Sequence, residues 1–188
     1  MIVEKNSARW FDILTFSFLA VVLLCAIVLN SSGKVPVPKA PPPTATTDPL
    51  RQVQLLSVAG VLGQFPECRE RFPHIVYAVT DAAREHGLRP QLLAAVVAVE
   101  SRCDALSVSW KGAIGITQVM PHVWTGQFDF QNRFNLFNEN DNLAVGSTIL
   151  QREIKQYGLR NGLEHYQGTG SGRDGNYVDR ILKLAGEK

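Results

Sequence analysis

The sequence lacks the patterns that carry several common chemistries. It has no phosphate-binding loop and no dinucleotide fingerprint. Its four histidines, at positions 74, 86, 122 and 165, are scattered and form no clustered set of metal ligands. We therefore expect no nucleotide or redox cofactor and no metal ion.

The sequence also has little charge imbalance in its C-terminal two thirds, residues 65–188. The formal net charge is +2, and residues 65–188 hold fourteen Lys and Arg against fourteen Asp and Glu. The excess lies in residues 1–64, which have five basic side chains against three acidic ones. A nucleic-acid-binding domain carries a basic patch, so we expect no nucleic-acid partner.

One long apolar run is present near the N-terminus. Residues 13–29 contain no charged side chain, and Trp10 and Phe11 come shortly before them. A helix over residues 10–29 spans roughly 30 Å, about the thickness of the hydrocarbon core, with the aromatic side chains at one interface. This pattern predicts a transmembrane anchor at 10–29 after a short cytoplasmic segment, 1–9. A cleaved signal peptide is the alternative, although no small-x-small cleavage site follows the run.

The next segment, 30–49, is rich in proline and poor in apolar side chains. This composition disfavours a helix, a sheet or a packed core, so we expect an extended stalk. In the polyproline II conformation such a stalk reaches up to roughly 60 Å. The remaining residues, 50–188, are numerous enough to form one domain with its own core.

Helical patterns dominate residues 50–188 and predict a mainly α (α+β) fold. The apolar stripe over 73–86 has proline at its start and glycine after its end, and 90–101 is apolar on nearly all sides, as in a buried central helix. Between these helices and the C-terminal part, Gly112 and Gly115 punctuate a β-branched stretch that predicts a small hairpin or looped ribbon. Further helices are predicted over 50–62, from near Pro121, over 139–157 and over 177–185, with a glycine-rich loop at 168–175.

Glu100 lies in the last turn of the predicted central helix. A carboxylate at a helix C-terminus gains nothing from the helix dipole, and apolar neighbours oppose its ionisation. Resistance to ionisation is what a general acid needs near neutral pH. The alternative is a glutamate whose carboxylate reaches solvent where the helix ends, and this feature alone does not decide between the two.

The residues around Glu100 resemble the signature of a known family. The motifs Glu100-Ser101, Ser109-x-x-Gly112-Ala113-x-Gly115 and Gln118-x-Met120-Pro121 are similar to those of the soluble-type (SLT) lytic transglycosylases. Asn142-Leu143-x-x-Gly146 and Tyr166-Gln167-Gly168, with Tyr177, resemble two later motifs of that family. The ordered set covers residues 73–182. The resemblance implies a lysozyme-like catalytic domain.

The resemblance also implies a reaction. Members of the family cleave the β-1,4 bond between N-acetylmuramic acid and N-acetylglucosamine in peptidoglycan and leave a 1,6-anhydromuramoyl end. Glu100 would protonate the glycosidic oxygen and then take the proton from the sugar's 6-hydroxyl, so no water attacks. An ordinary hydrolase needs a second carboxylate, yet residues 105–128 contain no Asp or Glu. This absence favours transglycosylation, unless Asp104, Asp129 or Glu164 folds into the cleft.

The resemblance assigns catalysis to Glu100 and substrate binding to eight further residues: Ser101, Ser109, Gly112, Ala113, Gln118, Met120, Tyr166 and Gln167. The two serines would orient the Glu100 carboxyl or bind substrate, and Gln118 would bind a sugar N-acetyl or hydroxyl group. Met120 would supply an apolar wall, and Tyr166 would lie close to the catalytic carboxyl. Asn142 is interpreted as a satisfied structural amide. The sequence departs from the family at Gln167, where Asn is usual, and at Val123, where Thr is frequent.

Three cysteines are present. Cys25 falls in the predicted anchor. Cys68 precedes the predicted helix 73–86 and Cys103 follows 90–101, so the two thiols can form a disulfide if these helices pack antiparallel. Two unrelated buried thiols are the alternative. A disulfide requires an oxidising compartment, which agrees with a periplasmic catalytic domain.

Two other functions are compatible with the sequence: a muramidase that hydrolyses the same bond, and a non-catalytic peptidoglycan-binding scaffold. The expected location is the bacterial inner membrane or a virion membrane, with the catalytic domain in the periplasm. The expected partners are peptidoglycan glycan strands and the cytoplasmic membrane, the latter through residues 10–29. The machinery of secretion, conjugation or phage entry is a further candidate partner, and the sequence does not choose among these settings.

Overall fold

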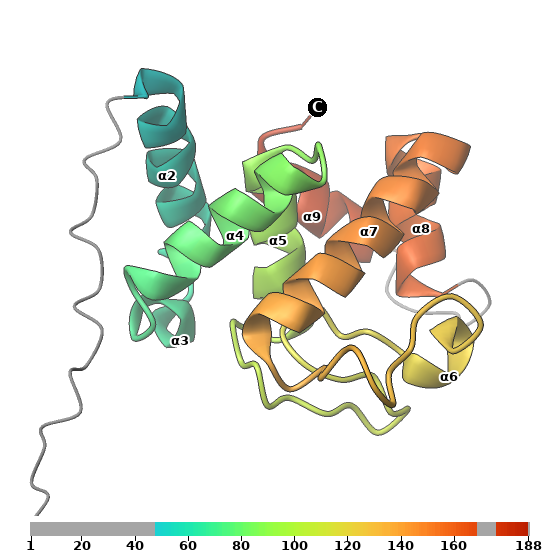
Figure 1. The fold of residues 1–188 in the computed structure, drawn as a ribbon. Helices are drawn as coiled ribbons and strands as arrows, with labels where there is room; N and C mark the ends of the chain where they lie inside the picture. The colour runs from blue at the N-terminus through green and yellow to red at the C-terminus, as the bar shows by residue number, and fades with distance from the viewer. Residues whose placement is uncertain (1–47, 169–175, 188) are drawn as a thin grey trace, which may run out of the picture. The chain divides into compact units, whose positions relative to one another are not determined.

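Eight helices make up most of residues 48–168 and 176–187, the part of the chain that the computed structural model describes (Figure 1). In chain order they are α2 (Pro49–Leu62), α3 (Pro66–Arg69), α4 (His74–Glu85), α5 (Pro90–Glu100), α6 (Pro121–Trp124), α7 (Glu139–Tyr157), α8 (Leu159–Gln167) and α9 (Tyr177–Ala185). The mainly helical prediction is confirmed for this part of the chain.

Some predicted segments lie outside the described residues. These are the anchor at 10–29 with its Cys25, nearly all of the stalk at 30–49, and the glycine-rich loop at 168–175 apart from Gly168. Within the described ranges, no helix is long and apolar enough to cross a membrane.

The observed helices match the predicted ones closely, with three exceptions. Helix α7 spans 139–157 and α9 spans 177–185 as predicted, and α4 and α5 end within one residue of the predicted bounds. The helix predicted from Pro121 is only one turn long. Helices α3 and α8 were not predicted, although α8 carries Leu159, Leu163 and Tyr166 at helical spacing.

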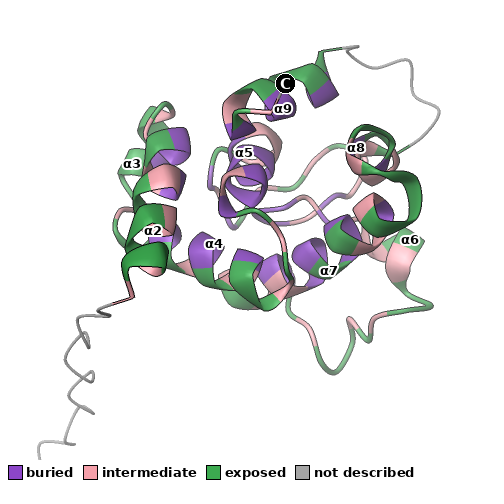
Figure 2. Cartoon of the chain, turned by 90° about the horizontal axis from the view of Figure 1, so that it is seen from above, coloured by how far each residue is buried: buried purple, intermediate pink, exposed green. Residues whose placement is uncertain are grey.

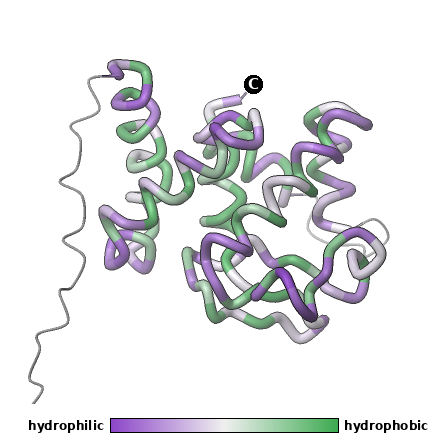
Figure 3. The backbone as a smooth tube through the Cα atoms, in the orientation of Figure 1, coloured by the Kyte–Doolittle hydropathy of each residue, from purple (hydrophilic) through white to green (hydrophobic). Residues whose placement is uncertain are grey.

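Helix α5 forms the centre of the core. Residues 92–98 are all buried, and α5 is coloured as buried along most of its length in Figure 2 and as strongly hydrophobic in Figure 3. Helices α2, α4 and α9 pack against it. A helix that is apolar on all sides is stable only when it is enclosed in this way. The core therefore fixes the C-terminal end of α5, where Glu100 lies.

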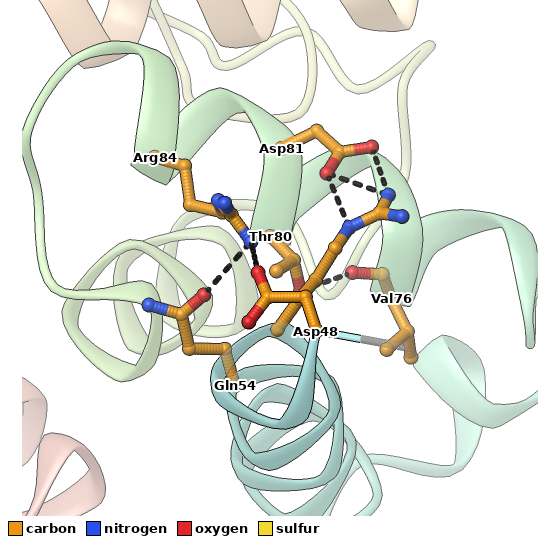
Figure 4. Close-up of polar contacts among 7 residues, drawn as sticks. Asp48, Gln54, Val76, Thr80, Asp81 and Arg84 are labelled. Atoms are coloured by element: carbon orange, nitrogen blue, oxygen red, sulfur yellow. Dashed lines mark hydrogen bonds and ion pairs between the residues drawn. The ribbon is translucent and has the colours of Figure 1, made fainter. Parts of the chain in front are cut away.

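Helix α2 is attached to α4 by polar contacts at its N-terminal end (Figure 4). The guanidinium of Arg51 lies 2.8 Å from both carboxylate oxygens of Asp81. Arg84 reaches Asp48 at 3.3 Å and Gln54 at 3.4 Å. Asp48 also caps α2 by accepting a hydrogen bond from the Leu50 backbone N–H at 3.0 Å. Exposed ion pairs contribute at most about 1 kcal/mol each, so the apolar contacts carry most of this attachment.

The segment 105–120 is a looped ribbon rather than a regular hairpin. Only two isolated antiparallel bridges are found in it, Val108 with Ile114 and Ile114 with Val119. Ile114 N–H donates to the Val119 carbonyl at 2.8 Å, and Val119 N–H donates back at 3.0 Å. Because Ile114 pairs with both Val108 and Val119, the ribbon consists of three short extended segments side by side, next to the C-terminal end of α5.

Asn142 of α7 holds this ribbon in place. Its side-chain oxygen accepts from the backbone N–H of Thr117 at 2.9 Å and from the Thr117 hydroxyl at 2.6 Å. Its amide nitrogen donates to the carbonyls of Ile114 at 2.8 Å and Leu136 at 2.9 Å. Gly115 has φ +78, and a Cβ added there would overlap the Asn142 amide. The fully buried amide thus has every hydrogen-bonding position filled, as a satisfied structural amide requires.

A disulfide joins Cys68 at α3 to Cys103, three residues beyond Glu100. Both cysteines are fully buried. Arg102 and Cys103 have positive φ angles of 53 and 67, a left-handed backbone that non-glycine residues rarely adopt. The disulfide ties this turn to the N-terminal half of the domain and so restrains the chain just after Glu100.

We expect loss of the disulfide to lower the free energy of unfolding by about 4 kcal/mol, because the bond closes a long loop in the unfolded chain. Denaturant unfolding of the full chain should show this for the Cys68→Ser/Cys103→Ser variant and for the parent chain in reductant. The Cys25→Ser variant is the matched control and should unfold like the parent. Equal unfolding midpoints with and without reductant would contradict a stabilising disulfide.

Candidate active site

A cavity of about 350 Å³ lies between the C-terminal end of α5, the ribbon, α8 and α9. Small-molecule sites commonly have volumes of about 300–1,000 Å³, so the cavity can hold part of a carbohydrate chain. It is lined by seven of the nine predicted site residues: Glu100, Ser109, Ala113, Gln118, Met120, Tyr166 and Gln167. Ser101 and Gly112 are not in the lining.

Glu100 is the last residue of α5 and is partly buried. The Tyr177 hydroxyl, from the first turn of α9, donates a hydrogen bond to its Oε1 atom. The carboxyl group therefore lies at the junction of α5 and α9, which are packed together in the core. This contact fixes the position of the carboxyl group relative to the cavity.

Two tyrosines lie near Glu100, and they make different contacts. Tyr166, which was predicted to be close to the carboxyl, lines the cavity but donates its hydroxyl proton to the Thr117 carbonyl at 2.8 Å. Tyr177 makes the hydrogen bond to the carboxyl. Burial, followed by the negative charge of Glu100, raises the pKa of both phenols above their ordinary value. Both hydroxyl groups therefore stay neutral donors throughout the physiological pH range.

The two serines contact the backbone rather than the Glu100 carboxyl. Ser101 Oγ donates to the Ile116 carbonyl at 2.7 Å, and a hydroxyl has a single proton to give. Its contact ties the end of α5 to the ribbon. Ser109 Oγ accepts from the Ala113 backbone N–H at 3.0 Å and so stabilises the turn that borders the cavity.

Gln118 is held in a strained backbone conformation with φ 54. Its amide nitrogen donates to the carbonyls of Gly115 at 2.9 Å and Ser107 at 3.2 Å. Both amide protons are thus committed to the ribbon. The side-chain oxygen is the atom that can serve a ligand, so Gln118 can accept a hydrogen bond from a sugar N–H or O–H group but cannot donate one without losing a ribbon contact.

Among the described residues, Glu100 is the only carboxylate in the cavity lining. Asp104 lies 3.6 Å from Arg71 in an ion pair, and Asp129 accepts hydrogen bonds from the backbone of its own loop. Glu164 is exposed on α8. The three carboxylates that were considered as second catalytic groups therefore lie elsewhere.

The lining includes six residues to which the sequence motifs assigned no site role: Val99, Trp110, Lys111, Asn176, Tyr177 and Arg180. Tyr177 was part of the family resemblance, and Arg180 follows it by three residues, on the same face of α9. This three-residue spacing in a predicted helix could have identified Arg180 as a candidate site residue from the sequence. No periodicity marks Trp110 and Lys111, because they lie in an irregular ribbon.

Comparisons with known proteins identify the domain. No curated protein and no solved structure matches the chain. The family model of the transglycosylase SLT domain matches residues 78–177, more than half of the 188 residues and the part that contains all nine predicted site residues. The chain therefore belongs to the transglycosylase SLT family.

Proposed function

We propose that the chain is a membrane-anchored peptidoglycan lytic transglycosylase that cleaves the bond between N-acetylmuramic acid and N-acetylglucosamine and forms 1,6-anhydro-N-acetylmuramic acid. The observation that carries this proposal is the cavity in which Glu100 is the only carboxylate among the described lining residues. Hydrolysis through two carboxylates needs a partner within about 10 Å of the acid, and no described residue of the lining supplies one.

The proposed reaction uses Glu100 twice. The protonated carboxyl first gives its proton to the glycosidic oxygen, and the bond from the anomeric carbon to that oxygen breaks. The resulting carboxylate then takes the proton of the 6-hydroxyl of the same sugar, whose oxygen bonds to the anomeric carbon. The proton taken restores the acid, so the cycle consumes no water. The hydrogen bond from Tyr177 holds the carboxyl in position through both steps.

Positive charge develops at the anomeric carbon as the bond breaks, and the substrate's own N-acetyl group can stabilise it. Gln118 supports this arrangement if its side-chain oxygen accepts the acetamido N–H, because its amide protons are already bound to the ribbon. The apolar side chain of Met120 would pack against the sugar ring. Ser101, Gly112 and Ala113 would act through the ribbon backbone.

The proposed setting is the periplasmic side of the inner membrane, or a virion membrane, with residues 10–29 as the anchor and 30–49 as the stalk. The Cys68–Cys103 disulfide supports an oxidising compartment. Local opening of the wall, for turnover or for a secretion, conjugation or phage entry machine, is the function that suits a tethered enzyme of this size.

Digestion of purified peptidoglycan separates the three candidate functions. A lytic transglycosylase releases muropeptides lighter by one water than those from a muramidase, and mass spectrometry distinguishes them. A wall-binding scaffold sediments with peptidoglycan and releases nothing. We expect anhydro products, and reducing muropeptides alone would show that the muramidase alternative is correct.

The Tyr177→Phe variant should lower kcat by about 10-fold, because a hydrogen bond to a charged group is lost at the reacting carboxyl. The alkaline limb of the pH–rate profile should move to higher pH, because the hydrogen bond that is removed stabilises the ionised form of the Glu100 carboxyl. Tyr77→Phe, at an exposed tyrosine of α4, is the control and should behave like the parent. An unchanged kcat and pH profile in Tyr177→Phe would mean that this hydrogen bond does not matter for turnover.

A further inference from the structure

The cavity carries more positive charge than the domain around it. Two cationic side chains, Lys111 and Arg180, line the cavity together with the single described carboxylate, Glu100. Residues 65–188 as a whole are balanced in charge. Lys111 belongs to the ribbon and Arg180 to α9, so the cations come from two of the segments that border the cavity.

Arg180 differs from most other arginines of the domain. Seven of the ten described arginines form ion pairs with carboxylates of the protein. Arg180 forms none with the described residues and is exposed. It also lies at the end of the first turn of α9, where the helix dipole disfavours a cation. Among the residues that the structure describes, neither an ion pair nor helix stability accounts for an arginine here.

Lys111 is positioned by its neighbour in the ribbon. Its Nζ atom lies 5.1 Å from the centre of the Trp110 ring, within the range of a cation–π contact. The Trp110 side chain is 89% exposed and also lines the cavity. The ring thus restrains the ammonium group near the mouth of the cavity, where it can meet a ligand.

We propose that Lys111 and Arg180 form a carboxylate-binding pair that recognises the lactyl–peptide branch of the muramoyl residue. This inference rests on the proposed function. The sugar rings of the substrate are uncharged, and its anionic groups are the carboxylates on this branch, either those of the peptide stem or the free lactyl group where the stem has been removed. Guanidinium and ammonium groups at the cavity give the enzyme a means to select strands by that charge.

The test compares two charge-removing variants of the full chain. Lys111→Met/Arg180→Met removes both cations from the cavity lining. Lys155→Met/Lys183→Met removes two exposed cations of α7 and α9 outside the lining and is the matched control. Each protein is assayed for kcat/KM on peptide-bearing glycan strands and on the same strands after their carboxylates have been converted to methylamides.

On peptide-bearing strands the cavity variant should lose on the order of 3- to 10-fold in kcat/KM, mainly through KM, and the control should lose nothing. The kcat/KM of the parent should fall by a similar factor when methylamide strands replace peptide-bearing strands. The kcat/KM of the cavity variant should be the same on both substrates. The parent's advantage should shrink as salt is added. The inference would be overturned if the cavity variant had a lower kcat/KM than the parent by the same factor on both substrates, or the same kcat/KM as the parent on both.

Strands treated with an amidase identify which carboxylate is bound, because they keep only the lactyl group. A charge-dependent loss on these strands assigns the pair to the lactyl carboxylate, and a loss confined to peptide-bearing strands assigns it to the stem. If the parent cleaved no strand, the proposed function would fall. Binding of the same strands to the parent and the cavity variant would still test the charge dependence.

Discussion

The Glu100→Gln variant should reduce turnover of peptidoglycan by at least about 1,000-fold, because a positioned general acid and base contributes up to about four orders of magnitude and in the proposed reaction one group serves both steps. Glutamine keeps the shape of the side chain and can still accept a hydrogen bond from Tyr177. We therefore expect the unfolding midpoint to stay near that of the parent. Release of soluble muropeptides measures the rate, and thermal unfolding measures the fold.

Glu164→Gln provides the control for this experiment. Glu164 is exposed on α8 and is absent from the cavity lining, so the same chemical change there should leave the rate unchanged. Residual lysis by Glu100→Gln near the rate of the parent would remove Glu100 from the mechanism. Unchanged wall binding by that variant would show that only the chemical step has been lost.

The Asn142→Leu variant should lower the free energy of unfolding by about 4 kcal/mol. Leucine has nearly the shape of asparagine but leaves the Thr117 N–H and the Leu136 carbonyl buried without partners, and the Ile114 carbonyl keeps only its bond from Val119. The ribbon would lose its attachment to α7, so turnover should fall together with stability. Denaturant unfolding and the muropeptide assay measure the two effects.

Asn140→Leu is the matched control, because Asn140 is exposed on the same helix two residues away. Surface substitutions of this kind usually change stability by no more than about 0.5 kcal/mol. If Asn142→Leu unfolded at the same denaturant concentration as Asn140→Leu, the Asn142 amide would not be the main attachment of the ribbon.

The sequence predicted the helical framework because most of its helices carry clear periodic patterns and end signals. Helix α5 is apolar on nearly all sides, α7 is followed by a glycine, and α9 has a strong apolar stripe. The buried amide of Asn142 could be interpreted from its place inside a helix. The Cys68–Cys103 disulfide followed from a packing arrangement that the sequence allowed but did not require.

Other features depend on contacts that a linear pattern does not contain. The ribbon has two isolated bridges and is shaped by side-chain contacts from Gln118 and Asn142, so no period of two marks it. The tyrosine that contacts Glu100 is determined by how α8 and α9 pack, and the motif order alone favoured Tyr166 over Tyr177. Ser101 was expected to orient the Glu100 carboxyl or to bind substrate, yet its proton goes to the ribbon backbone.

We propose that Glu100 completes the reaction without water, and digestion of peptidoglycan in heavy-oxygen water tests this most directly. In the proposed reaction the ring closes with the sugar's own 6-hydroxyl, so we predict that the new muramoyl ends are anhydro ends and carry no heavy oxygen in the mass spectrum. A muramidase would add one labelled oxygen to each new reducing end. Labelled reducing ends from the parent chain, absent from Glu100→Gln, would contradict the account.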